Sequence, residues 1–169
     1  AAPSLIDFSD ESQATLDMYG VNREEGDLKK FRNGGSDEFR SFAVDCLLAR
    51  RMVERGVRFV QLFVNGQIWD NHQSIKKSLA DCCRKTDQPT AALVKDLKAR
   101  GLLDTTLVHW GGEIGRLPVT ESHGAEEKAG RDHNGQGFST WLAGGGIKGG
   151  VTYGETDEFG FLPVAGKVH

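Results

Sequence analysis

Apolar residues recur at helical spacing in two parts of the chain. Between residues 36 and 56, Ser36 offers an N-cap, and the apolar positions that follow are spaced by three and four residues: Phe39, Phe42, Ala43, Cys46, Leu47 and Val53. A second helical pattern runs from residue 73 to residue 100. Because Pro89 lies inside it and proline removes a backbone donor, we predict a kink or a fresh start near Asp87.

Strand patterns lie between and after these helices. Residues 57–64 read Val-Arg-Phe-Val-Gln-Leu-Phe-Val, a mostly apolar run typical of a strand covered on both faces. A second strand is predicted over Thr106–Trp110 and a third over residues 138–143. The order strand, helix, strand forms a βαβ unit, which predicts parallel strands with a right-handed crossover. The pattern therefore favours an α/β domain.

The lead-in differs from the rest of the chain. Residues 1–35 are polar and interrupted by glycines, with one short helix predicted over Glu11–Tyr19 and Ser9 or Asp10 as its N-cap. Residues 36–169 hold the α/β pattern, which ends in a turn-rich piece with no closing helix. We therefore expect the sequence to be a fragment at both ends.

Composition and charge exclude several classes of function. The net charge of −3 gives no electrostatic case for nucleic acid, and no apolar run approaches the roughly 18 residues of a membrane span. The three cysteines, Cys46, Cys82 and Cys83, lack the spacing of a disulfide framework or a zinc knuckle, so we expect them to be structural. A G-x-G-x-x-G pattern at 144–149 is followed by no helix, which argues against dinucleotide binding.

Acidic and histidine side chains follow the predicted strands. Asp70 and His72 come after the first strand, and Glu113 comes after the second. Parallel neighbours place their carboxyl ends at one edge of a sheet, so we expect these residues to lie together. Asp132 and His133 belong to a polar loop of about twenty residues, and loops of that length are commonly functional.

These five residues supply oxygen and nitrogen donors of the kind that divalent metals take. Two ions about 3.5–4 Å apart would clamp a transferred phosphoryl or sulfuryl group, and Arg116 or Arg131 would bind its anionic oxygens. The alternative interpretation is that Asp70 caps the following helix and that the histidines, His72 and His133, are surface residues.

Several longer motifs resemble a bacterial, sulfatase-like family known as domain of unknown function 1501, of the alkaline phosphatase superfamily. They keep their order along nearly the whole chain: Leu48-Ala49-Arg50-Arg51-Met52-Val53-Glu54-Arg55-Gly56-Val57-Arg58-Phe59-Val60-Gln61, Trp69-Asp70-x-His72, Thr86-Asp87-Gln88-Pro89, Asp96-Leu97-Lys98-Ala99-Arg100-Gly101-Leu102-Leu103, Gly111-Gly112-Glu113-Ile114-Gly115-Arg116, Gly130-Arg131-Asp132-His133 and Trp141-Leu142-Ala143-Gly144-Gly145-Gly146. The family's usual Phe and Thr are replaced here by Ile114 and Leu117.

The resemblance implies a three-layer α/β/α fold with a mostly parallel sheet, of which residues 36–169 would be the C-terminal part. It also implies a site with two divalent ions, zinc first, with calcium, manganese or iron as alternatives. Asp70 and His72 would bind one metal, Glu113 and His133 would be ligands, and Asp132 would lie beside them. Glu113 departs from the acid–histidine pair that phosphatases usually carry at that strand end.

The function implied by the resemblance is hydrolysis of a sulfate or phosphate ester, carried by a small molecule or a glycan, in an exported protein. The nucleophile would lie in an N-terminal half of the same protein, so we expect residues 1–169 alone not to turn over substrate. The alternative is a non-catalytic module of the same fold that binds an anion or a sulfated glycan. An isomerase or mutase of the superfamily is disfavoured, because nothing resembles a sugar-phosphate clamp.

Overall fold

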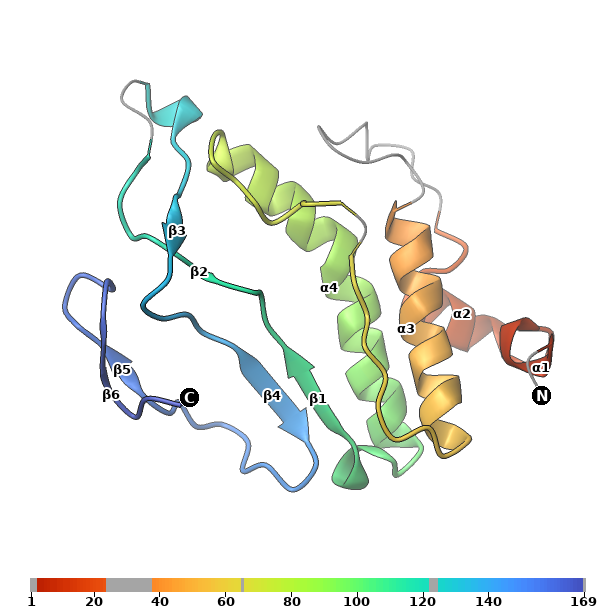
Figure 1. Ribbon diagram of the computed structural model, residues 1–169. Helices are drawn as coiled ribbons and strands as arrows, with labels where there is room; N and C mark the ends of the chain where they lie inside the picture. The colour runs from red at the N-terminus through yellow and green to blue at the C-terminus, as the bar shows by residue number, and fades with distance from the viewer. Residues whose placement is uncertain (1–2, 24–37, 65, 122–124, 169) are drawn as a thin grey trace.

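The computed structural model describes residues 3–23, 38–64, 66–121 and 125–168, and within them helices gather on one side and short strands on the other (Figure 1). The helices are α1 (Pro3–Ile6), α2 (Gln13–Tyr19), α3 (Glu38–Glu54) and α4 (Ile75–Ala99), with single 3₁₀ turns η1 (Leu103–Thr105) and η2 (Glu126–Lys128). The strands are β1 (Leu107–Trp110), β2 (Gly115–Arg116), β3 (His133–Asn134), β4 (Trp141–Gly144), β5 (Glu155–Thr156) and β6 (Pro163–Ala165). The predicted cap Ser36 lies outside the described residues.

The core lies where α3 packs against α2 and α4. Four members of the apolar stripe predicted for α3 are buried and pack against Tyr19 and Val21 of the lead-in and Ala92 of α4: Phe42, Ala43, Cys46 and Leu47. Val53, also predicted for the stripe, is half-buried. The short helix of the lead-in is confirmed as α2, but its N-cap is Ser12, whose hydroxyl oxygen accepts a hydrogen bond of 3.1 Å from the backbone N–H of Thr15. The predicted caps Ser9 and Asp10 are therefore wrong.

Helix α4 runs through Pro89 without a new start at Asp87. Pro89 is buried, as are Cys82, Ala92 and Leu97, so the same face of the helix packs on its neighbours before and after the proline. Burial of this face before and after Pro89 offsets the backbone hydrogen bond that the proline removes. This explains why no new helix begins near Asp87.

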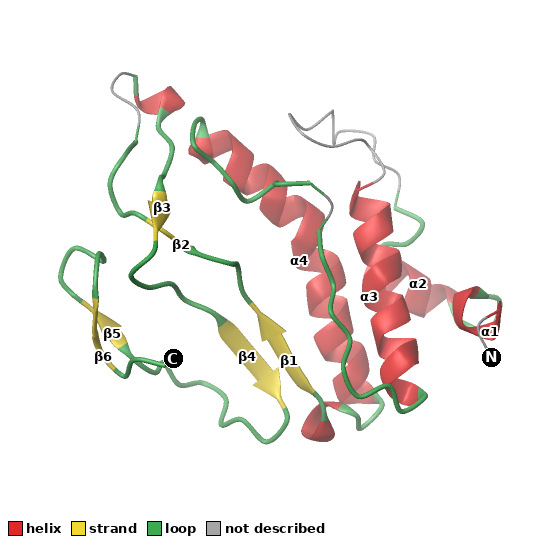
Figure 2. Ribbon diagram, in the orientation of Figure 1, coloured by secondary structure: helices red, strands yellow, loops and turns green. Residues whose placement is uncertain are grey.

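The strands pair antiparallel. β1 pairs with β4, with Leu107 opposite Gly144 and Trp110 opposite Trp141. β2 pairs with β3, and β5 pairs with β6. Figure 2 shows that loops make up much of this side of the molecule. No described strand has a parallel partner, so the predicted parallel βαβ pair is not observed in this part of the chain.

Residues 57–64 are extended but join no sheet within the described chain. Leu62 and Val64 pack against the helical core, whereas Phe59 and Phe63 on the other face are 79% and 73% exposed. The backbone N–H groups of residues 58–64 bond to no other described residue. The alternation of more and less buried side chains in this segment follows from its sequence. A strand also needs a neighbouring backbone to pair with.

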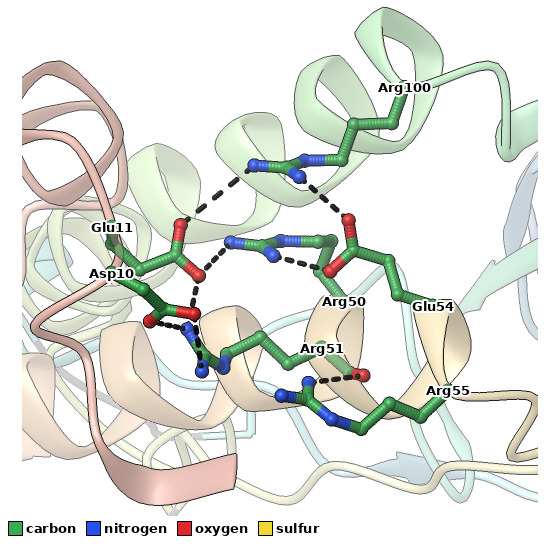
Figure 3. A pocket seen from close by; sticks show the side chains of 7 residues that line it. All are labelled: Asp10, Glu11, Arg50, Arg51, Glu54, Arg55 and Arg100. Atoms are coloured by element: carbon green, nitrogen blue, oxygen red, sulfur yellow. Dashed lines mark hydrogen bonds and ion pairs between the residues drawn. The ribbon is translucent and has the colours of Figure 1, made fainter. Parts of the chain in front are cut away.

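A network of charges fastens the lead-in to the helices (Figure 3). The buried guanidinium of Arg50 lies 2.7 Å from Glu11, 2.6 Å from Glu54 and 2.9 Å from Asp96. Its contacts with Glu11 and Asp96 are ion pairs at short range without hydrogen-bond alignment. A cavity of about 270 Å³ lies among these side chains, and its lining is charged throughout: Asp10, Glu11, Arg50, Arg51, Glu54, Arg55 and Arg100.

Candidate metal centre

Three loop segments meet near the first residue of α4. The segment before α4 is bonded to the segment before β3, since the backbone N–H of Arg131 donates to the carbonyl of Asn71 at 3.0 Å. The segment after β2 joins them, since the N–H of Leu117 donates to the carbonyl of Asp132 at 2.8 Å. Short loop-to-loop bonds of this kind bring residues together that are far apart in the sequence.

The β2–β3 pair sets the registration of two predicted site residues. Arg116 in β2 lies directly opposite His133 in β3. A side chain on Gly115 would collide with the backbone carbonyl of Gly137, so only glycine allows the chain to approach this closely. The turn after β1 is therefore held against the aspartate–histidine segment.

Three side-chain nitrogens approach one carboxylate oxygen. The Oδ1 atom of Asp70 lies 3.0 Å from Nε2 of His72, 3.1 Å from Nε2 of His133 and 2.5 Å from Nη1 of Arg116. Burial raises the pKa of Asp70, but the hydrogen bonds from His133 and Arg116 outweigh it and hold this pKa below its ordinary value of 3.8. The site thus contains an ionised carboxylate.

The other ring nitrogen of His72 faces a second carboxylate. Nδ1 of His72 lies 2.6 Å from Oε2 of Glu121, and ligand atoms of His72, Glu121 and Asp132 lie within 4.8 Å of one another. The hydrogen bond to Glu121 raises the pKa of His72 above 6.5, with Asp70 adding to the effect and partial burial opposing it.

The remaining predicted residues are placed differently. Glu113 is 76% exposed and bonds to Nη2 of Arg116 at 3.3 Å, outside both groups of potential metal ligands. The guanidinium of Arg116 is thereby shared between Glu113 and Asp70. Nη1 of Arg131 donates to the backbone carbonyl of Leu117 at 3.3 Å, so Arg131 braces the loop.

The alternative interpretation of Asp70 as a helix cap does not describe the structure. The N-cap of α4 is Ser74, which makes no capping hydrogen bond through its side chain. Glu121 was missed by the sequence analysis, because it stands in a polar loop without a motif or a ligand-like spacing to a second residue. The loop histidine His123 lies outside the described residues.

Asp70, His72 and His133 suit a divalent cation. They combine a carboxylate oxygen with two imidazole nitrogens, and their ligand atoms all lie within 4.8 Å of one another. Bonds of about 2.0–2.1 Å in a tetrahedral site place neighbouring ligand atoms about 3.3 Å apart. The distances of 3.0 and 3.1 Å from Asp70 to the two histidines are close to that value, so small movements would suffice.

Among the described residues, no helix combines the length and apolar character that crossing a membrane requires. Comparisons with curated proteins and with solved structures give no match. A family model described as "Protein of unknown function (DUF1501)" matches residues 1–169. The chain therefore belongs to the DUF1501 family.

Proposed function

We propose that Asp70, His72 and His133 bind one divalent cation, with zinc as the first candidate. The observation that carries this proposal is the convergence of one carboxylate oxygen and two imidazole nitrogens, contributed by two distant loops, within 4.8 Å. Exposed acidic and histidine residues often cluster without a metal, but here two loops are bonded together, and the rings of His72 and His133 lie 5.0 Å apart between centroids.

We further propose that the site belongs to a metal-dependent hydrolase of sulfate or phosphate esters, related to the alkaline phosphatase superfamily. A bound divalent cation supplies Lewis-acid polarisation of a sulfuryl or phosphoryl oxygen. Arg116 lies beside Asp70, and its fork of donors matches the oxygens of such an ester. A cation bound by Asp70 would compete with the Asp70–Arg116 ion pair and would leave the guanidinium of Arg116 available to the anion. His133 lies opposite Arg116 in the β2–β3 pair, so the proposed metal ligand and the proposed anion-binding side chain are neighbours.

The proposed fold is a three-layer α/β/α domain to which this chain contributes its C-terminal part. Residues 57–64 support it, because they present one face to the helices and leave their backbone groups and two phenylalanines uncovered in the described chain. We propose that a strand from outside residues 1–169 of the same protein pairs with them. Amide hydrogen exchange tests this: residues 58–64 should exchange fast in the 169-residue chain and slowly in a longer polypeptide.

Zinc titration of the 169-residue chain tests the metal site. We expect one zinc ion per chain by calorimetry and by metal analysis after dialysis, with affinity reduced at least about tenfold in Asp70→Asn. Glu113→Gln is the matched control, because Glu113 lies outside the ligand groups. Equal zinc affinity in the wild type and Asp70→Asn would contradict the proposal.

Esterase assays address the reaction. With p-nitrophenyl sulfate and p-nitrophenyl phosphate we expect no turnover by residues 1–169 and zinc-dependent, Asp70-dependent turnover by a longer polypeptide that contains them. The alternative is a binding module: retention on a sulfated glycan by a longer polypeptide that hydrolyses neither ester would favour it over the hydrolase.

A further inference from the structure

We propose that Glu121 is a positioning residue that fixes the tautomer and ring orientation of His72, so that Nε2 is presented to the cation. This inference rests on the metal site proposed above and adds a residue that lies in no recognised motif. It predicts that the affinity of Asp70, His72 and His133 for the cation falls when Glu121 is replaced.

The hydrogen-bond geometry of His72 carries the argument. Its Nδ1 atom lies 2.6 Å from Oε2 of Glu121, while its Nε2 atom faces Asp70 at 3.0 Å. A carboxylate accepts but does not donate, so Nδ1 must hold a proton. Nε2 faces the Asp70 carboxylate, so it also holds a proton while His72 is charged. A cation bound there would replace the Nε2 proton, and the proton kept on Nδ1 by Glu121 would leave the lone pair of the neutral ring on Nε2.

A second cation between His72 and Glu121 is the competing arrangement, because Asp132 also lies near them. Two atoms that bind one ion through bonds of about 2.0–2.1 Å are typically about 3.3 Å apart. The separation of 2.6 Å between Nδ1 and the carboxylate is that of a direct, charge-assisted hydrogen bond. The geometry therefore assigns Glu121 to the support of His72.

The backbone holds Glu121 in place for this role. The N–H of Glu121 donates to the carbonyl of Gly130 at 3.1 Å. Gly130 is buried against the carbonyl group of His72, where a Cβ would collide. The segments that carry the carboxylate and the imidazole thus both contact Gly130, at a point that leaves no room for a larger residue.

The test combines zinc affinity with a spectroscopic measurement of the tautomer. Wild type, Glu121→Gln and Glu121→Ala are titrated with zinc alone, and the histidine ring nitrogens are observed by long-range ¹H–¹⁵N spectroscopy. Glu127→Gln is the control, because Glu127 is an exposed acid in the same loop. We expect zinc affinity to fall about 10–100-fold in Glu121→Ala and less in Glu121→Gln, whose amide oxygen still accepts from Nδ1.

In the zinc-loaded wild type, Nδ1 of His72 should carry the proton. Unchanged zinc affinity in Glu121→Ala, or a proton on Nε2 in the wild type, would overturn the inference. A purely structural role would lower the unfolding midpoint and leave the tautomer unchanged.

Failure of the metal site itself has a different signature, because wild type and Asp70→Asn would then both take up no zinc. The metal-free chain, observed at alkaline pH, still separates the outcomes. If the wild type carries the proton on Nδ1 of His72 and Glu121→Ala does not, the result supports positioning by Glu121. A proton on Nε2 in the wild type overturns it.

Discussion

Gly130 packs against His72 so closely that a Cβ on the glycine would overlap the carbonyl group of the histidine. We expect Gly130→Ala to push the two loops apart, lowering the free energy of unfolding by about 1–3 kcal/mol as overpacking usually does. Zinc affinity should fall with it, because His72 and His133 lie on the separated loops. Urea unfolding and zinc titration measure the two effects.

Gly135→Ala provides the matched control for this change. Gly135 lies in the same region, two residues after His133, and a Cβ there would meet no atom within 4 Å. This variant should unfold and bind zinc like the wild type. Similar behaviour of the two alanine variants would show that the contact between Gly130 and His72 is unimportant.

The ionisation of His72 should be shifted in the metal-free protein. The hydrogen bond to Glu121 raises the pKa of His72 above 6.5, so NMR titration should give a midpoint above that value, and Glu121→Gln should lower it. Because the folded-state pKa is the higher one, the stabilisation from this pair is present below pH 6.5 and is lost as the pH rises through the raised pKa. Zinc must displace a proton from Nε2, so zinc affinity should increase over the same rise in pH. A midpoint at or below 6.5 would contradict the hydrogen bond.

Arg50 should be important for folding rather than for binding. Its guanidinium is buried between Glu11 and Asp96, and Arg50→Met would remove one of the guanidinium groups beside each of these carboxylates. Arg51 would still contact Glu11, and Arg100 would still contact Asp96. Breaking a buried pair outright costs about 3–5 kcal/mol, so we expect a loss of up to about that size, which urea unfolding followed by circular dichroism would measure. Arg55→Met is the control, since Arg55 donates to the carbonyls of Arg51 and Ser4, and we expect a loss of about 1 kcal/mol or less. If the two variants lost the same unfolding free energy, the charge network around Arg50 would not be what fastens the lead-in to the helices.

The cysteines should differ in reactivity according to burial. Burial raises the pKa of Cys82 to about 11, and it raises the pKa of the buried Cys46 thiol as well. Cys83 is less buried, so a thiol reagent at pH 8 should label Cys83 first and the other two only after unfolding. Mass spectrometry of digested protein after timed labelling distinguishes the sites, and labelling in urea supplies the fully reactive reference. Fast labelling of Cys82 in the folded chain would contradict its burial.

The sequence by itself determined the local elements. Helical spacing of apolar residues predicted α3 and most of α4, because a buried helix face needs an apolar side chain every three or four residues. The β-branched and aliphatic run that ends at Trp110 predicted β1. Asp70, His72 and His133 were recognised as candidate ligands from residue type and from their places in loops, and the structure brings these three together.

Tertiary structure alone decided how those elements meet. Glu121 became a partner of His72 through loop contacts that span 49 positions, a relationship that no local pattern records. The antiparallel pairing of β1 with β4 and the continuation of α4 through Pro89 likewise depend on packing between distant residues. Periodicity reports which face of an element is buried, whereas pairing and site geometry depend on which other segment covers that face.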